Sequence, residues 1–360
     1  MKDGARVVMP PSEWPTRDRE CWTSVTAPVT SLYGPGAQAA RLSKATVKLY
    51  QQSLGCWFGF LARFRELPPH TGLALITPAR LDRYVDDQRA RHVSNTTIRM
   101  RLQGLHGAVS LMLPAADFGF IMRPGGLALS IALPSTPRAI QIKGVAELLS
   151  IAQDLFVQGE ARQGYAGGMV AFRDAALLGI LATSAPRRRS LHEMELGRHI
   201  SQRGPEYWLN FEDGNMKGGQ RQGYPLPATL TPMLDAYIQV ARPALGGASA
   251  QAFWIGPGGR AIAPGTIYQI VTRRTLKAFG HRHGPHWFRT CLTTEAALDS
   301  PGSLLDVSTR LGHSPGVSLK HYNQASAVAA AKRHDANVSE LMKATKLLAE
   351  QAFAKRLQQR

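Results

Sequence analysis

Residues 286–322 read HWFRTCLTTEAALDSPGSLLDVSTRLGHSPGVSLKHY, and the rest of the chain is interpreted from this stretch. His286 and Arg289 are three positions apart, so on a helix both side chains lie on one face and can reach a common site. His313 follows Arg289 by 24 positions, and Tyr322 follows His313 by nine. Tyr322 is also the only tyrosine in the last quarter of the chain. The stretch therefore offers imidazoles, a guanidinium and a single phenol as candidate site groups.

The composition is that of a basic globular protein. The chain has 360 residues, a length that suits two domains, and 44% of them are hydrophobic. Lys and Arg number 43 against 25 Asp and Glu, which gives a formal charge of +18 and a pI near 10.3. This charge favours a polyanionic partner such as a nucleic acid, with a merely basic soluble enzyme as the alternative.

Cysteines and apolar segments bear on where the protein works. Cys21, Cys56 and Cys291 form no C-x-x-C pair, so neither a disulfide framework nor a thiolate zinc site is predicted, and a reducing compartment fits. Met1–Trp14 lacks the apolar run of a secretory signal, and Ala175–Ala182 is much shorter than the ~18 residues of a membrane span. We therefore expect a cytoplasmic protein without membrane contact, nucleoid-associated in a prokaryote.

Residues 41–115 are predicted to form a small all-helical domain. Apolar residues recur at helical spacing behind the capping residues Ser43 and Thr77, and a third apolar stripe runs from Ile98 to Met112. The arginines outside these stripes form either a solvated face or contacts to phosphate. The DNA-binding candidates among them are Arg99 and Arg101.

Residues 140–324 are predicted to form a second, mostly helical domain with one small antiparallel sheet. Helical patterns cover Val145–Phe156, Met169–Leu181, Thr231–Leu245 and Thr266–Phe279. Strand-forming residues 206–212 and 222–226 flank turn residues and predict a β-hairpin. Lys217 lies near the tip of this hairpin, beside two glycines.

Three segments fall outside the two domains. Residues 1–40 contain five prolines and no periodicity, and they are predicted to be an extension of unclear role. Residues 116–139 are rich in proline and glycine, which predicts a linker. Residues 325–360 are alanine-rich and basic, which leaves a partner-docking amphipathic helix and a frayed terminus as equal alternatives.

The histidine, arginine and tyrosine side chains of residues 286–322 are the types of group that cleavage of a phosphodiester bond needs. Attack on a phosphodiester adds negative charge to its nonbridging oxygens, and preorganised cations stabilise that charge. Arginine suits this role because its planar fork binds phosphate through two hydrogen bonds. A tyrosine, with its usual pKa of ~10, needs a strongly positive site to act as a nucleophile. The departing sugar oxygen needs a proton, which a hairpin lysine can supply.

The sequence resembles the tyrosine recombinase family, also called the phage integrases. Its members resemble one another in a His-x-x-Arg box, a Leu-Gly-His box 24 residues after that arginine, and a tyrosine nine residues later. His286, Arg289, His313 and Tyr322 match these residue types and both spacings. A lone His-x-x-Arg would be nearly worthless, whereas the combined match is specific. The resemblance covers residues 43–324, and in the N-terminal half it extends only to general helical architecture.

The resemblance also implies a first arginine and a hairpin lysine. Arg187 follows a small-residue turn and precedes a leucine by four positions, so we predict it as the first arginine, with Arg188 as its rival. Lys217 matches the lysine, although Arg221 could also approach a phosphate. Arg188 and Arg221 are therefore kept as DNA-binding candidates.

The chain departs from the family pattern beside the first arginine. Ser190 stands where many members have an acidic residue, and Ala185-Pro186 replaces a glycine-containing turn. The first departure leaves open how Arg187 is supported, and we expect Glu193 or Glu195 to help.

The resemblance implies a mostly α, two-domain fold with a SAM-like helical core-binding domain and an α+β catalytic domain that together clamp duplex DNA. Tyr322 would form a 3′-phosphotyrosyl bond and release a 5′-hydroxyl, which attacks a partner strand on the way through a Holliday junction. The implied partners are double-stranded DNA and further copies of the chain, as a tetramer on two paired sites, with accessory proteins left open. No cofactor and no metal is expected.

Two other functions compete with the site-specific recombinase. A type IB topoisomerase-like enzyme would share the cleavage chemistry but rejoin the same strand. A non-catalytic DNA-binding regulator could carry the same fold. The complete set of Arg187, Lys217, His286, Arg289, His313 and Tyr322 favours the recombinase.

Overall fold

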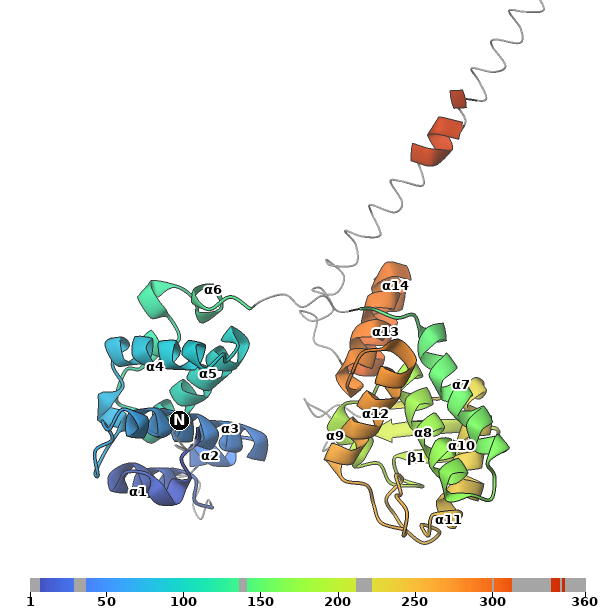
Figure 1. Cartoon of the computed structure of the whole chain (residues 1–360), viewed down its shortest axis with the longest axis horizontal. Coiled ribbons are helices and arrows are strands. Elements are labelled where there is room, and N and C mark those ends of the chain that lie inside the picture. The colour runs from blue at the N-terminus through green and yellow to red at the C-terminus, as the bar shows by residue number, and fades with distance from the viewer. Residues whose placement is uncertain are drawn as a thin grey trace, which may run out of the picture. The chain divides into compact units, whose positions relative to one another are not determined.

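The computed structural model describes residues 7–28, 37–135, 141–211, 222–299, 301–312, 338–343 and 345–346. The chain divides into two compact units, Met1–Ala139 and Ile140–Arg360, which Figure 1 colours from blue to green and from green to red. The described residues are mostly helical and contain one small antiparallel sheet, which confirms the predicted fold class. Within the predicted tail, the described residues 338–343 and 345–346 are helical and exposed.

The secondary structure of the first unit is helical, with no strand among its described residues. Its α-helices are α1 Thr16–Val25, α2 Ala37–Ala40, α3 Lys44–Arg63, α4 Pro78–Ala90, α5 Asn95–Met112 and α6 Leu129–Ala132, with short 3-10 helices at Pro11–Glu13, Leu73–Leu75, Gly119–Ile121 and Pro124–Gly126. The predicted caps are confirmed, because Ser43 accepts a hydrogen bond from Thr46 N at 3.1 Å and Thr77 accepts one from Arg80 N at 3.4 Å. Helices α3 and α5 approach closely where Gly104 faces Ser53, whose Oγ would lie 2.2 Å from an added Cβ.

The N-terminal extension forms part of the first unit. Trp14 and Trp22 are buried in its core, and Trp14 packs on Phe58 with ring centroids 5.3 Å apart. The buried Asp18 carboxylate accepts hydrogen bonds from Thr71 Oγ1 at 2.7 Å and Gly72 N at 2.6 Å. Helix α1 is therefore anchored to the segment between α3 and α4.

The segment predicted as a linker also packs on the first unit over its described part. Ile121, Leu129 and Leu133 are buried in the same core as Trp22. Their helices are only three or four residues long and are interrupted by Pro124, so no helical period marks them in the sequence. Burial of scattered apolar residues, rather than periodicity, assigns this segment to the unit.

The second unit wraps helices around a long apolar helix. Its elements are α7 Val145–Ala161, α8 Ala166–Thr183, α9 Arg188–His192, β1 Ile200–Arg203, β2 Glu206–Phe211, β3 Gln222–Pro225, α10 Thr231–Asp235, a π-helical turn Ala236–Ala241, α11 Arg242–Ala244, α12 Pro264–Phe279, α13 Pro285–Asp299 and α14 Pro301–Leu311. Helix α8 is long and apolar enough to cross a membrane, but 78% of it is buried inside the unit. Apart from the buried pair Arg173 and Asp174, its buried residues are apolar, as expected of a helix that other elements surround.

The sheet has the order β1-β2-β3 among the described strands, with antiparallel neighbours. Leu209 at the centre of β2 pairs with Ile200 on β1 and with Tyr224 on β3. The strands of the predicted hairpin are confirmed, whereas β1 was not predicted. The tip of the hairpin, residues 212–221, lies outside the described residues.

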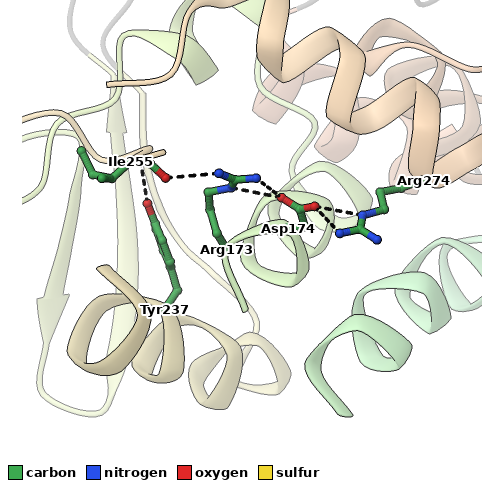
Figure 2. A network of polar contacts seen from close by, with 5 residues as sticks. All are labelled: Arg173, Asp174, Tyr237, Ile255 and Arg274. Atoms are coloured by element: carbon green, nitrogen blue, oxygen red, sulfur yellow. Dashed lines mark hydrogen bonds and ion pairs between the residues drawn. The ribbon is translucent and has the colours of Figure 1, made fainter. Parts of the chain in front are cut away.

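A buried polar network holds α8 against its neighbours (Figure 2). Asp174 accepts hydrogen bonds from Arg173 Nη2 at 2.7 Å and from Arg274 Nη2 at 2.6 Å, which joins α8 to α12. Arg173 also donates to the Ile255 carbonyl at 3.3 Å, and Ile255 N donates to the Tyr237 hydroxyl at 3.0 Å. Because the Asp174 side chain is fully buried, its charge depends on these two guanidinium groups.

Candidate functional site

The site begins at a strained turn that ends α8. The amides of Ser184 and Ala185 both donate to the Ile180 carbonyl, at 2.9 and 3.1 Å. Ala185 is fully buried and has a φ of +35°, a conformation that costs an L-residue roughly 1 kcal/mol. Glycine usually occupies such a position after a helix. The turn sends Arg187 into the start of α9 and directs the Ala185 carbonyl toward α13.

Arg289 forms hydrogen bonds to this turn and to a second segment of the chain. It lies in the second turn of α13, is only 5% exposed, and donates to the Ala185 carbonyl at 2.7 Å and the Leu311 carbonyl at 2.6 Å. These bonds tie α13 to the ends of α8 and α14. Burial, and then the charge of Arg187, lower the pKa of Arg289 to about 10, so the guanidinium stays protonated at neutral pH.

Arg187 lies in the same pocket as Arg289. Its Nη2 donates to the Gly312 carbonyl at 2.6 Å, and its buried Nη1 has no hydrogen-bond partner among the described residues. Arg188 is exposed and does not line this pocket. Of the two candidates for the first arginine, the structure therefore brings Arg187, and not Arg188, to Arg289.

The expected acidic support for Arg187 is not found in the described contacts. Glu193 pairs with the exposed Arg189 at 2.9 Å, and Glu195 pairs with Arg198 at 3.4 Å. A backbone carbonyl, that of Gly312, takes the place of a carboxylate beside Arg187. A carbonyl accepts a hydrogen bond without neutralising the cation, so Arg187 keeps its full charge.

His286 lies at the start of α13 with an exposed side chain. Its pKa is lowered, first by partial desolvation and then by the charge of Arg289, so the imidazole is neutral at neutral pH. The other nearby histidines have different surroundings: His283 stacks on Trp287 with ring centroids 4.0 Å apart. Within the described parts of the chain, no group of three or more His, Cys, Asp or Glu residues could hold a metal ion.

The pocket is also lined by Tyr224 on β3 and by Arg310 at the end of α14. Neither residue was predicted from the sequence as a site residue. The Arg310 guanidinium carbon lies 5.0 Å from the centroid of the Tyr224 ring, and Arg310 Nη2 is 3.4 Å from Ser184 Oγ. Burial raises the pKa of Tyr224 although Arg310 and Arg289 oppose the shift. In the sequence, the only signal is the position of Arg310 directly before the Leu-Gly-His box.

Four predicted site residues lie outside the described residues. Lys217 and Arg221 belong to the connection between β2 and β3, and His313 and Tyr322 follow Gly312, the last described residue of this part of the chain. Their roles remain predictions. The described residues bring together Arg187 and Arg289 in one pocket and place His286 within the electrostatic reach of Arg289.

The DNA-binding candidates of the first unit have different surroundings. Arg101 donates to the buried Gln88 side chain at 2.5 Å, so at least part of its role is to hold α5 to α4. Arg99 lines a surface pocket with Gln103 and Arg123 and has no hydrogen bond or ion pair among the described residues. Of these two arginines, Arg99 is therefore the one whose guanidinium has no partner among the described residues.

Comparisons with known proteins identify the fold. No protein-family model matches the sequence, and no curated protein does. The XerH site-specific recombinase bound to palindromic difH substrate in a post-cleavage complex matches with a TM-score of 0.58 and 16% identity over 88% of each chain. XerH in a pre-cleavage complex with difH matches with a TM-score of 0.54 and 15% identity over 88% of this chain and 96% of that one. A third similar structure, the XerA recombinase, has a TM-score of 0.41 and 16% identity over 88% and 98%.

The two XerH structures show that this chain has the fold of the tyrosine recombinases. The fold expected from residues 286–322 and from the helical pattern of the N-terminal half is thus confirmed. At 15–16% sequence identity, this similarity shows the fold alone.

Proposed function

We propose that this protein is a site-specific DNA recombinase that cleaves and rejoins DNA strands through a covalent 3′-phosphotyrosyl intermediate on Tyr322. The observation that carries the proposal is the pairing of Arg187 with the buried Arg289 in one pocket, with no carboxylate bound to either among the described residues. Guanidinium groups without a carboxylate partner are suited to bind a phosphate. Leu311 lines this pocket, and in the sequence it precedes His313 by two residues and Tyr322 by eleven.

In the proposed reaction, Arg187 and Arg289 bind the nonbridging oxygens of one phosphodiester and stabilise the charge that develops there. The Tyr322 phenol gives its proton to solvent and its oxygen attacks phosphorus, the bond from phosphorus to the 5′-oxygen breaks, and Lys217 gives that oxygen its proton. His286 and His313 complete the proposed set of groups around the phosphate. The phosphotyrosyl bond retains the energy of the broken diester, so rejoining needs no ATP.

Strand exchange follows when the 5′-hydroxyl of a second duplex attacks the phosphotyrosyl bond. The proposal assigns four copies of the chain to two paired sites and a Holliday junction between them. The net charge of +18 supports a DNA partner, as do the solved XerH structures, which are complexes with difH substrate. We further propose that the protein works in the cytoplasm, associated with the nucleoid of a prokaryotic cell.

A covalent trap tests the proposed function. The target site is first found by sequencing the DNA that becomes covalently attached to the protein. A substrate nicked next to the scissile phosphate then loses a short fragment after cleavage, so that rejoining fails and the adduct accumulates. Wild type should accumulate the adduct and Tyr322→Phe should not. Equal behaviour of the two proteins would contradict the assignment of the nucleophile.

Intact duplexes separate the two competing enzymes. With two differently labelled intact duplexes, strand transfer from one to the other is expected of a recombinase, whereas a topoisomerase-like enzyme would only restore the original strand. A DNA-binding regulator would shift the duplex in a gel without any adduct.

A further inference from the structure

Arg310 is a third cation of the pocket, and the proposed function does not yet use it. It lines the pocket together with Arg187 and Arg289 and comes from a third segment of the chain, the last turn of α14. Its described contacts are the Ser184 hydroxyl at 3.4 Å and the Tyr224 ring at 5.0 Å. Neither contact carries a negative charge.

The pocket therefore combines three guanidinium groups with neutral partners only, within the described residues. Arg187 and Arg289 bind backbone carbonyls, and Arg310 binds a hydroxyl and the face of an aromatic ring. Arginine remains protonated at any ordinary pH, so these charges repel one another until an anion enters. The arrangement is expected of a site that meets its counter-charge in a ligand.

Tyr224 holds Arg310 without neutralising it. A cation over an aromatic face is attracted by the ring quadrupole, and that attraction needs the ring but not the hydroxyl. Burial raises the pKa of Tyr224, so at neutral pH the phenol is uncharged beside the arginines. Ser184 adds a neutral oxygen on the second side of Arg310. The guanidinium is thus held by neutral groups on two sides.

We propose that Arg310 is a third phosphate-binding arginine of this site, held by Tyr224 and Ser184, and that it contacts one nonbridging oxygen of the phosphodiester attacked by Tyr322. The inference rests on the proposed function, because it needs a phosphate in the pocket. It makes Arg310 a catalytic residue and makes Tyr224 and Ser184 positioning residues. It also predicts which atom of the substrate Arg310 contacts, and this can be tested.

The test measures the rate of adduct formation by the full-length protein on nicked substrates with three kinds of scissile linkage. One carries an ordinary phosphate, and the other two carry a methylphosphonate of either stereochemistry, in which a methyl group replaces one nonbridging oxygen. On phosphate, Arg310→Ala should be slower than wild type by about 100-fold, the loss typical of one oxyanion donor. On the stereoisomer that lacks the oxygen bound by Arg310, the variant should match wild type, while the other stereoisomer should retain the penalty.

Variants of Tyr224 test the positioning. Tyr224→Phe keeps the ring under the cation and should stay within about twofold of wild type. Tyr224→Leu removes the ring and should slow adduct formation about 2- to 5-fold, with the same stereoisomer dependence as Arg310→Ala. A penalty for Tyr224→Leu that is equal on all three linkages would overturn the positioning role of this residue.

The matched control is Arg189→Ala, which removes an exposed arginine on α9 that is paired with Glu193. It should leave all three rates unchanged, and thermal melting should show that each variant is folded. Equal penalties of Arg310→Ala on phosphate and on both methylphosphonates would assign Arg310 a purely structural role and overturn the inference. Unchanged rates for Arg310→Ala beside an active wild type would also overturn it while leaving the proposed function standing. A wild type without any adduct would contradict both.

Discussion

Two arginine clusters in the second unit show how the partner of a guanidinium decides its role. Arg173 and Arg274 share the fully buried carboxylate of Asp174, so both charges are compensated within the fold (Figure 2). Arg187 and Arg289 instead bind the carbonyls of Gly312, Ala185 and Leu311. The charges of the first cluster are balanced by a carboxylate, whereas those of the second have no carboxylate partner among the described residues.

The uncompensated cluster is held rigidly although its charges repel. Arg289 uses two backbone carbonyls from different segments, which fixes the plane of its guanidinium. Its pKa of about 10, lowered by burial and by Arg187, is the electrostatic consequence of this arrangement. A phosphate bound by both arginines would relieve the repulsion, which is the physical basis of the proposed phosphate site.

The largest expected effect comes from breaking the compensated cluster. Asp174→Asn leaves Arg173 and Arg274 without a buried counter-charge and should lower the free energy of unfolding by about 3–5 kcal/mol. Denaturant unfolding followed by circular dichroism measures this loss. Asp154→Asn, which removes an exposed carboxylate on α7, should change stability by less than about 0.5 kcal/mol. Similar small effects of both variants would remove the distinction between the clusters.

Substitution in the second cluster, Arg187 and Arg289, should instead lower the rate of adduct formation. Arg289→Lys keeps the charge but loses the two-sided fork that binds Ala185 and Leu311, so adduct formation should slow by about 100-fold or more. DNA binding, measured by gel shift at fixed salt, should change far less than the rate. A lysine variant with a nearly normal rate would show that charge alone is sufficient and that the geometry of the fork is not needed.

The turn that joins the clusters should gain stability from a glycine. Ala185 has a φ of +35°, and Ala185→Gly should raise the free energy of unfolding by about 0.5–1 kcal/mol, because the relief of strain exceeds the added entropy of the unfolded chain. Ala182→Gly, one turn earlier within α8, is the matched control and should destabilise by about 1 kcal/mol or more. Loss of stability in both variants would argue against strain at Ala185.

The smallest effect concerns pH. The folded-state pKa of His286 lies below its ordinary value, so the unfolded chain binds more protons at mildly acidic pH. The contribution of His286 to stability is therefore complete above pH ~6.5 and is lost as pH falls through the range between that unfolded value and the lowered folded value. His286→Gln should flatten this part of the profile of unfolding free energy against pH. An unchanged slope would contradict a lowered pKa of His286 in the folded protein.

The sequence predicted the parts of the site that follow local rules. The spacing of His286 and Arg289 on a helix, the caps at Ser43 and Thr77, and the long helical stripes all depend on nearby residues. The strands of the hairpin could be predicted for the same reason, from a short alternation and turn residues.

The rest depends on contacts between distant segments. The stacking of Arg310 on Tyr224 joins a helix end to a strand, and neither residue is unusual in its own segment. The burial of Trp22 and Leu133 in one core likewise results from tertiary packing of short, aperiodic elements. The support of Arg187 by the Gly312 carbonyl, where an acidic side chain was expected, involves a backbone group that every residue carries.

Mapping the DNA-linked residue tests the central claim most directly. After trapping on a nicked substrate, nuclease and protease digestion followed by mass spectrometry identifies the peptide that carries the nucleotide remnant. The account predicts that this remnant is attached to the Tyr322 side chain alone. Attachment to Tyr224, whose ring lies beside Arg310, or the absence of any covalent peptide from an otherwise DNA-binding protein, would contradict it.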